Sequence, residues 1–279
     1  MLAPDLPGRV SCPAYAQATV IDQRYTLNAA RDAGYQGGMA WINNETGDDL
    51  NDGTATNPVK TLEQGKTIAQ SKNLRRLRIV DSISETLVSS YEDFEIIGDD
   101  SASKFLVLNG QNLNNTSLIH VAVTGDIGGY VSPFTQSVVN IDNALLYGPI
   151  NKLGGVIRNS SFLAFPGTGS PASGSPAPAN FAFQFAGGIT TTVMNCTTAN
   201  VEQGNFGIPV MRVNEILSDV CFRNWTGPMH VDGLSSNFSD IEIDCTAGEI
   251  TILNTCVLGT IRVRGSCTLI DNSGPNCTV

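Results

Sequence analysis

Two segments near the C-terminus repeat one pattern, GEITILNTC at 248–256 and GTIRVRGSC at 259–267. Their glycines, aliphatic residues and cysteines are all shifted by eleven positions, and Cys245 lies a further eleven residues before Cys256. Stacked coils of a β-solenoid require such a repeat, because one coil cannot bury its apolar face without a neighbour. Eleven residues suffice for one or two sides of a coil, and a complete three-sided coil needs about twice that length.

Short apolar runs continue this pattern upstream, with Gly, Asn, Asp or Ser between them. From residue 77 onward they include RIVDSI, FLVLNG, LIHVAVTG and DIEIDC. No long helical pattern interrupts them, which argues against alternating strands and helices. Their number also exceeds what one immunoglobulin sandwich holds. The sequence therefore predicts an all-β solenoid from about residue 74 to 279.

One helix is predicted before the first coil. Thr61 is suited to cap its N-terminus, and Gln64, three residues later, would complete a capping box. We expect the helix over 61–72, preceded by a short strand at 41–43 and followed by a strand at 74–80.

Composition excludes several classes of protein. Charged residues make up only 15% of the chain, and Gly and Pro together number 41 of 279, which disfavours helical bundles and coiled coils. The formal net charge of −10 argues against a nucleic-acid partner, since phosphate binding needs clustered Lys and Arg. No apolar run is long enough to span a membrane, so we expect no membrane insertion.

The chain divides into two predicted parts. Residues 1–40 show no sustained period and are interpreted either as a flexible leader or as an arm that docks on a partner. Residues 41–279 form the solenoid domain, with the most regular repeats at about 240–279. Within it, the Pro-, Gly- and Ser-rich segment 166–179 is interpreted as a long loop that leaves a coil.

The seven cysteines are expected to be mostly reduced. The N-terminus lacks the basic and then apolar regions of an export signal, which favours assembly in a cytosol. Cys245, Cys256 and Cys267 are expected to stack inside the solenoid as small buried residues. Disulfides are the first alternative to this ladder. A metal site is the second, although no pair of ligands has the spacing of a zinc site.

Three acids alternate with apolar residues in the segment 240–245. Asp240, Glu242 and Asp244 must share one face of a strand, about 7 Å apart, which is within the range of an inverting glycosidase. The other interpretation is a solvent-facing acidic strip that pairs with Arg262 and Arg264 on a nearby strand. We favour the solvent-facing strip and keep the three acids as the weaker catalytic candidates.

Other chemistry-bearing residues fit structural roles. Asp99 and Asp100 follow a strand end and are expected in a turn. His120 and His230 form no metal-binding pattern, and no nucleotide-binding, zinc-protease or serine-hydrolase motif is present, so no metal or cofactor is expected. Asn-x-Ser/Thr triplets are interpreted as turn residues rather than as glycan acceptors; they begin at Asn44, Asn114, Asn115, Asn159, Asn195, Asn224, Asn237 and Asn276.

Two stretches resemble phage tail and tailspike proteins that fold as a right-handed parallel β-helix. In the first, the matching residues are Trp41, Asp52-Gly53, Asn57-Pro58-Val59 and the predicted helix at 61–72. In the second, 259–265 and 269–274 resemble the closing repeats of tail appendages. Pectate-lyase-like solenoids share the first motif.

This resemblance implies a virion component, assembled in the host cytoplasm as a homotrimer and displayed at a tail or a head vertex. The expected role is structural or receptor-binding. The arm is expected to bind other virion proteins, and host surface polysaccharide is a further expected partner of the protein. The alternative is a polysaccharide lyase or hydrolase on the same solenoid. The chain is short for a depolymerase tailspike and shows no clear acid pair, so we favour the non-enzymatic role.

Overall fold

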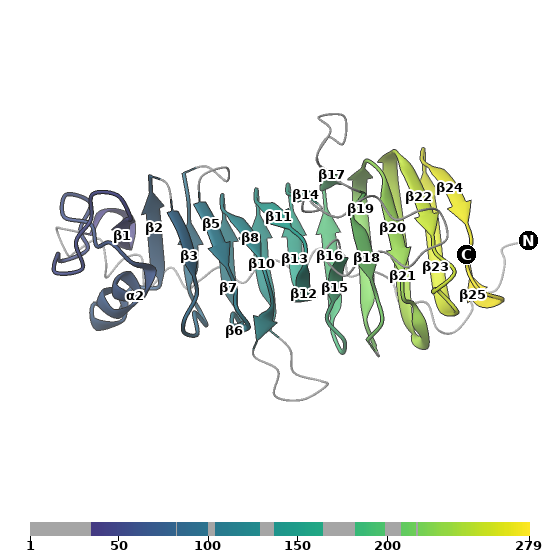
Figure 1. Cartoon of the computed structure of the whole chain (residues 1–279), viewed down its shortest axis with the longest axis horizontal. Helices are drawn as coiled ribbons and strands as arrows, with labels where there is room; N and C mark the ends of the chain where they lie inside the picture. Colours follow the sequence, from purple (N-terminus) through teal and green to yellow (C-terminus); the bar gives the residue numbers. More distant parts are fainter. Residues whose placement is uncertain are drawn as a thin grey trace, which may run out of the picture.

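The computed structural model describes residues 35–81, 83–99, 104–128, 137–163, 182–198, 208–215 and 217–279. Figure 1 shows an elongated stack of short strands, with the helix α2 (Leu62–Ser71) at one end and β24 and β25 at the other. The predicted all-β solenoid is confirmed. The predicted loop at 166–179 and residues 1–34 of the predicted arm lie outside the described residues. Among the last residues of that arm, Tyr35 is buried, Gln36–Gly38 form the 3₁₀ helix η1, and β1 begins at Met39.

The strands form three faces. The first face is the longest: β1 (Met39–Asn43), β2 (Arg76–Val80), β4 (Glu95–Ile97), β7 (Thr116–Ile119), β10 (Val139–Asp142), β13 (Gly155–Arg158), β16 (Thr190–Met194), β19 (Asp219–Thr226), β21 (Ser235–Ala247), β23 (Leu258–Gly265) and β25 (Asn276–Thr278). The second face is β3 (Ile83–Thr86), β5 (Lys104–Val107), β8 (Ala122–Thr124), β11 (Leu145–Tyr147), β14 (Ser161–Leu163) and β17 (Thr197–Thr198), which joins β19. The third face is β12 (Ile150–Leu153), β15 (Ala182–Phe185), β18 (Val210–Arg212), β20 (Met229–Asp232), β22 (Glu249–Ile252) and β24 (Thr268–Asp271), with β6 (Gln111–Asn112) and β9 (Ile127–Gly128) as a separate pair.

The pairing between these strands is parallel throughout, which excludes an immunoglobulin sandwich. On the first face, Ile241 of β21 pairs with Ile261 of β23, so one full coil separates these two residues. The eleven-residue repeat therefore carries the chain from one face to the next, from Ile250 on the third face to Ile261 on the first. As predicted, a full coil is about twice the repeat.

The core is built from columns of apolar side chains that stack in register. On the first face, one column holds the central inward residue of each coil, and none of its members is more than 1% exposed: Leu77, Ile96, Leu118, Ile141, Ile157, Val193, Phe222 and Ile243. Parallel strands that are buried on one side alternate inward and outward residues, which explains the period of two in the sequence.

The helix α2 covers the N-terminal end of this core. The predicted span of 61–72 is confirmed, with Thr61 as the N-cap, Lys72 as the C-cap, and Leu62 and Ala69 buried. Gly65 lies against β1 so closely that a Cβ atom there would stand 2.8 Å from the Ile42 side chain. The helix therefore seals the first coil at a distance that only glycine permits.

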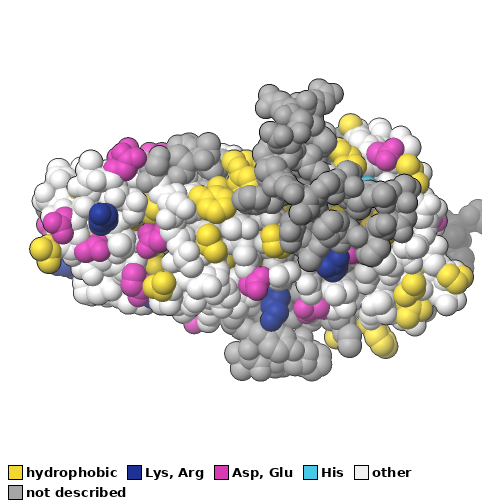
Figure 2. All heavy atoms as spheres, in the orientation of Figure 1, with side chains coloured by type: hydrophobic (Ala, Val, Ile, Leu, Met, Phe, Trp, Pro, Cys, Tyr) yellow, Lys and Arg dark blue, Asp and Glu magenta, His cyan; other side chains and the backbone are white. Residues whose placement is uncertain are grey.

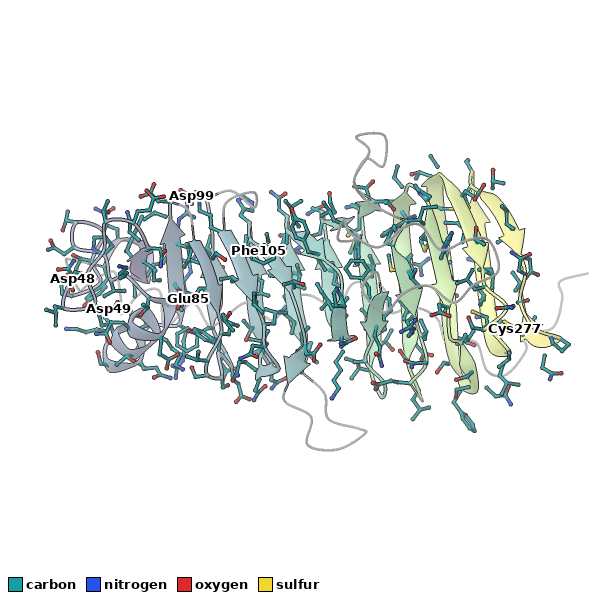
Figure 3. All side chains as sticks on the ribbon, in the orientation of Figure 1. Asp48, Asp49, Glu85, Asp99, Phe105 and Cys277 are labelled. Atoms are coloured by element: carbon teal, nitrogen blue, oxygen red, sulfur yellow. A yellow bond between two sulfur atoms is a disulfide. The ribbon has the colours of Figure 1, made fainter. Side chains whose placement is uncertain are left out.

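Two carboxylates secure the start of α2. The Thr61 hydroxyl accepts from the Gln64 N–H at 3.2 Å, but the Thr61 N–H donates to Asp49 Oδ1 at 2.9 Å, so the reciprocal half of the predicted capping box is taken by Asp49. The Leu62 N–H donates to the Glu85 carboxylate at 3.1 Å. Figure 3 shows Asp49 and Glu85 at this end of the molecule. Negative charge at a helix N-terminus is favourable because of the unpaired N–H groups and the helix dipole, which offsets part of the cost of burying the Glu85 carboxylate.

Charged residues occupy core columns at both ends of the solenoid. Glu85 stands in register with the buried Leu106, so it points inward beneath α2. At the other end, Asp271 is in register with Ile252 and continues the column of Val231, both of which are buried. Asp271 itself is exposed.

We predict that Trp225→Ala lowers the free energy of unfolding by about 3–5 kcal/mol. Trp225 is fully buried and its ring packs edge-on against Phe162 at 5.3 Å and Phe222 at 5.5 Å between ring centroids. Urea unfolding followed by circular dichroism measures the change. Phe238→Ala is the matched control, because Phe238 is 71% exposed and its loss should change the free energy by less than about 0.5 kcal/mol.

We also predict that Glu85→Gln raises the melting temperature at pH 7. Burial raises the pKa of Glu85 and the charges of Asp49 and Glu63 raise it further, although the Leu62 N–H bond lowers it. A raised pKa means that the ionised group destabilises the fold above that pKa, and that this cost disappears below the ordinary pKa of glutamate. The increase in melting temperature that Glu85→Gln produces should therefore become smaller as the pH falls. Thermal melts from pH 7 to pH 4 test this, and Glu45→Gln at an exposed position should show no such trend.

Candidate functional site

The acidic strip lies on the outer side of the first face, near its C-terminal end. Asp240, Glu242 and Asp244 alternate with the buried Ile241 and Ile243 along β21, so the three acids share the outer side as predicted. β19 and β23 flank this strand and present their own outward side chains beside it.

Arginines from both neighbouring strands meet these acids. Arg262 of β23 lies 3.4 Å from the Asp240 carboxylate, which agrees with the expected cross-strand pairing. Arg223 of β19 lies 3.3 Å from Glu242, a contact that the sequence did not suggest. Asp244 stands in register with Arg264. The strip is therefore an alternation of charges across three strands.

Asp219 of β19 joins this strip and was missed by the sequence analysis. Its Oδ1 accepts from the Asp240 N–H at 2.9 Å. Burial raises the pKa of Asp219 and the neighbouring Asp240 charge raises it further, while the hydrogen bond from the Asp240 N–H lowers it. One carboxyl with a raised pKa beside another held by an arginine is the arrangement that separates acid and base roles in catalysis. The available signal was Ser218-Asp219-Val220, repeated one coil later as Ser239-Asp240-Ile241.

The three aromatic residues nearest this strip in sequence divide between the core and the surface. Phe222 and Trp225 are fully buried within the solenoid, whereas Phe238 is 71% exposed two residues before Asp240. Of these three, only Phe238 presents a ring to solvent on which a sugar could stack.

The other acids singled out in the sequence have structural partners. Asp99 lies in the bend after β4 and forms an ion pair with the buried Lys104 at 3.1 Å, while Asp100 lies outside the described residues. Figure 3 shows Asp99 among the early coils, towards the cap-helix end of the molecule. On the face drawn in Figure 2, acidic side chains are spread along the molecule rather than gathered in one patch.

Both histidines lie apart from any ligand-like cluster. His120 is in a turn between β7 and β8, where its Nε2 lies 2.8 Å from the Asn143 side-chain amide. His230 is half-buried on β20, and burial lowers its pKa. Among the described residues, no group of three or more His, Cys, Asp and Glu side chains has the arrangement of a metal site.

The cysteine ladder predicted from the sequence is wrong for two of its three members. Cys245 and Cys267 are joined by a disulfide across one coil. A full coil is about twice the eleven-residue repeat, so cysteines two repeats apart come into contact and cysteines one repeat apart do not. Cys221 is also disulfide-bonded. Cys196, Cys256 and Cys277 are free, so the prediction that the cysteines are mostly reduced is wrong for half of the six cysteines that the structure describes.

An asparagine ladder runs along the turn between the first and second faces. Asn224 donates to Asn195 at 2.9 Å, Asn195 to Asn159 at 3.4 Å, and Asn159 to Asp142 at 2.9 Å. The three asparagines have φ of 51–53°, a left-handed conformation that asparagine adopts more readily than most residues. Each begins an Asn-x-Ser/Thr triplet, and its side-chain amide is a donor within the ladder. The predicted turn role is confirmed at Asn159 and Asn195, whereas Asn224 lies within β19.

A polar cleft of about 600 Å³ lies beside the cap helix, at the opposite end of the solenoid from the acidic strip. Its lining includes Tyr35, Asp49, Asp52, Gln64, Ile68 and Lys72. The Tyr35 hydroxyl donates to the Asp52 carbonyl at 2.7 Å, and the Lys72 ammonium lies over the Tyr35 ring. Tyr35 therefore links the loop that contains Asp52 to the end of the cap helix.

Comparison of the chain with protein-family models, with curated proteins and with solved structures found no match. In the part of the chain that the structure describes, no helix has the length and apolar character needed to cross a membrane.

We predict that Asp240→Asn lowers the pKa of Asp219. The change removes the like charge that raises this pKa, while the backbone N–H that donates to Asp219 remains. A carboxyl ¹³C NMR titration of the native chain and the variant measures the shift. Asp244→Asn, which leaves the Asp219–Asp240 contact intact, is the control. An unchanged Asp219 titration in Asp240→Asn would show that the two carboxyls do not interact.

Proposed function

We propose that the chain is a non-enzymatic structural protein of a phage virion, serving as a tail or vertex appendage that acts as a spike, a receptor-binding component or an adaptor. The observation that carries the proposal is the N-terminal segment that resembles phage tail and tailspike proteins. In the structure it forms the short strand β1, a turn-rich loop, the cap helix α2 and the first full coil, in the order that the resemblance implies.

The parallel solenoid supports this role mechanically. Most strands inside the stack are hydrogen-bonded to the corresponding strands of the coils before and after them, and apolar columns run through the stack. Such a structure transmits load along its long axis without hinges between domains. A component that projects from a particle requires this stiffness.

The acidic strip also favours a structural role. Asp240 and Glu242 each lie within 3.4 Å of an arginine, so their charges are balanced by protein groups on neighbouring strands. Cross-strand pairs of this kind stabilise adjacent coils modestly.

We further propose that the protein is a homotrimer and that its N-terminal arm contacts other virion proteins. The open last coil supports an assembled state, because Leu269 and Ile270 of its strand β24 are 42% and 38% exposed. The exposed end coil of a solenoid requires capping or oligomerisation.

The arm and the trimer are tested by separate experiments. Deletion of residues 1–34 tests the arm and leaves the described solenoid complete, because that solenoid begins at the buried Tyr35. The shortened chain should keep the circular dichroism spectrum of the full chain but fail to incorporate into particles. Light scattering of the full chain should give three times the mass of one chain. A stable monomer at micromolar concentration would contradict the trimer, and normal incorporation of the shortened chain would contradict the docking role.

A polysaccharide-cleaving enzyme is the second candidate, and the raised pKa of Asp219 beside Asp240 is the observation that favours it. Incubation with host capsule or lipopolysaccharide, followed by analysis for released oligosaccharide, decides between the two. We expect no release. Release by the native chain that is abolished in Asp219→Asn or Glu242→Gln, with Glu45→Gln as the control, would replace the structural proposal with the enzymatic one.

A further inference from the structure

Two free thiols lie close together at the C-terminal end of the solenoid. Cys256 follows β22 and is fully buried, and Cys277 lies in β25, half-buried and packed against the core. Figure 3 shows Cys277 at the end of the molecule opposite the cap helix. Neither thiol belongs to the acidic strip or to the disulfide between Cys245 and Cys267.

The backbone places Cys256, at the corner before β23, and Cys277, in β25, close together in consecutive coils. The Gly274 N–H donates to the Cys256 carbonyl at 2.8 Å, and the Cys277 N–H donates to the Gly274 carbonyl at 3.1 Å. Gly274 alone therefore links the Cys256 backbone to the Cys277 backbone through two hydrogen bonds.

The side chains of both cysteines face the interior. Cys277 pairs with Gly259, which is on the same side of its strand as the buried Ile261. The Cys256 Sγ lies 3.5 Å from the Val231 carbonyl inside the core. The two sulfurs consequently enter the same apolar space from neighbouring coils.

Electrostatics agrees with this proximity. Burial raises the pKa of Cys256 to about 12, and the charge of a Cys277 thiolate contributes to the increase. Burial also raises the pKa of Cys277, which remains the more accessible of the two thiols.

The sequence spacing matches that of the existing cross-link. Cys245 and Cys267 have a sequence separation of 22 and are bonded across one coil. Cys256 and Cys277 are separated by one position fewer. One coil separates Cys245 from Gly265 and Gly259 from Cys277, so both cysteine pairs are slightly more than one coil apart along the chain.

We propose that Cys256 and Cys277 are a second disulfide site, which closes on exposure to a small-molecule disulfide such as oxidised glutathione. The Cys277 thiolate attacks one sulfur of glutathione disulfide, forming a mixed disulfide and releasing one reduced glutathione. The Cys256 thiolate then attacks the Cys277 sulfur and releases the second. The two protein thiols lose two electrons, the glutathione disulfide gains them, and the two thiol protons pass to the released glutathiones.

The cross-link would join the last strand to the coil before it. Among the described strands, β25 pairs only with β23. The loops closed by the two disulfides, 245–267 and 256–277, overlap in sequence, so the second bond would attach β25 to a coil that the first bond already holds. Oxidation would therefore hold the last strand covalently on the preceding coil.

The test uses the full native chain. It is incubated with oxidised glutathione, quenched with acid, denatured and alkylated with N-ethylmaleimide, and then analysed by intact mass and by peptide mapping without reduction. We expect two fewer alkylated cysteines than in the untreated chain and a linked peptide pair containing Cys256 and Cys277. Free alkylation of both residues, a glutathione that stays on Cys277, or a link from either residue to another cysteine would overturn the proposal.

Three variants supply controls. Cys196→Ser removes another buried free thiol and should leave the loss of two alkylations unchanged. Cys277→Ser, at the half-buried position, should leave Cys256 alkylated after treatment. Cys256→Ala should stop the reaction at the mixed disulfide on Cys277, and circular dichroism verifies that this core variant is folded. A linked peptide that persists in either of the last two variants would also overturn the proposal.

Discussion

Register between consecutive coils is the constraint on which the whole structure depends. An inward side chain such as Ile141 is buried only because Leu118 and Ile157 stand above and below it in the same column. A slip of one residue would turn every aliphatic side chain of a strand to the outside. Coil lengths are nevertheless free to vary, because insertions at the corners leave the columns intact. The coil from Leu118 to Ile141 is accordingly longer than the next coil, from Ile141 to Ile157.

Polar groups at the corners reinforce this register. The asparagine ladder joins three consecutive coils at the corner between two faces. Its members Asn159, Asn195 and Asn224 have a left-handed backbone, and their side-chain amides form hydrogen bonds from one coil to the next. The arginine pairs of the acidic strip act similarly on the outer side. The surface of the solenoid therefore contributes to alignment as well as to solubility.

The sequence predicted features that depend on local spacing. The alternation of Asp240, Glu242 and Asp244 was enough to place them on one face, and Thr61 with its following residues was enough to place the cap helix. Features that depend on coil length were missed. The contact of Asp219 with Asp240, and the disulfide of Cys245 with Cys267 rather than a thiol ladder, both require the number of residues in a coil. Because that number varies along the chain, no single repeat in the sequence determines which residues become neighbours.

Asp271 bears on how copies of this protein can associate. It occupies a core column in the last coil, where Val231 and Ile252 stand in the two coils before it. A second copy stacked end-on would have to bury this carboxylate among aliphatic side chains, at a high desolvation cost. Inward charges of this kind are a known protection of exposed sheet edges. Growth into end-to-end fibres, the characteristic hazard of a solenoid with open edges, is thus opposed at both ends of the stack, by the Asp271 carboxylate in the last coil and by the helix α2 over the first coil.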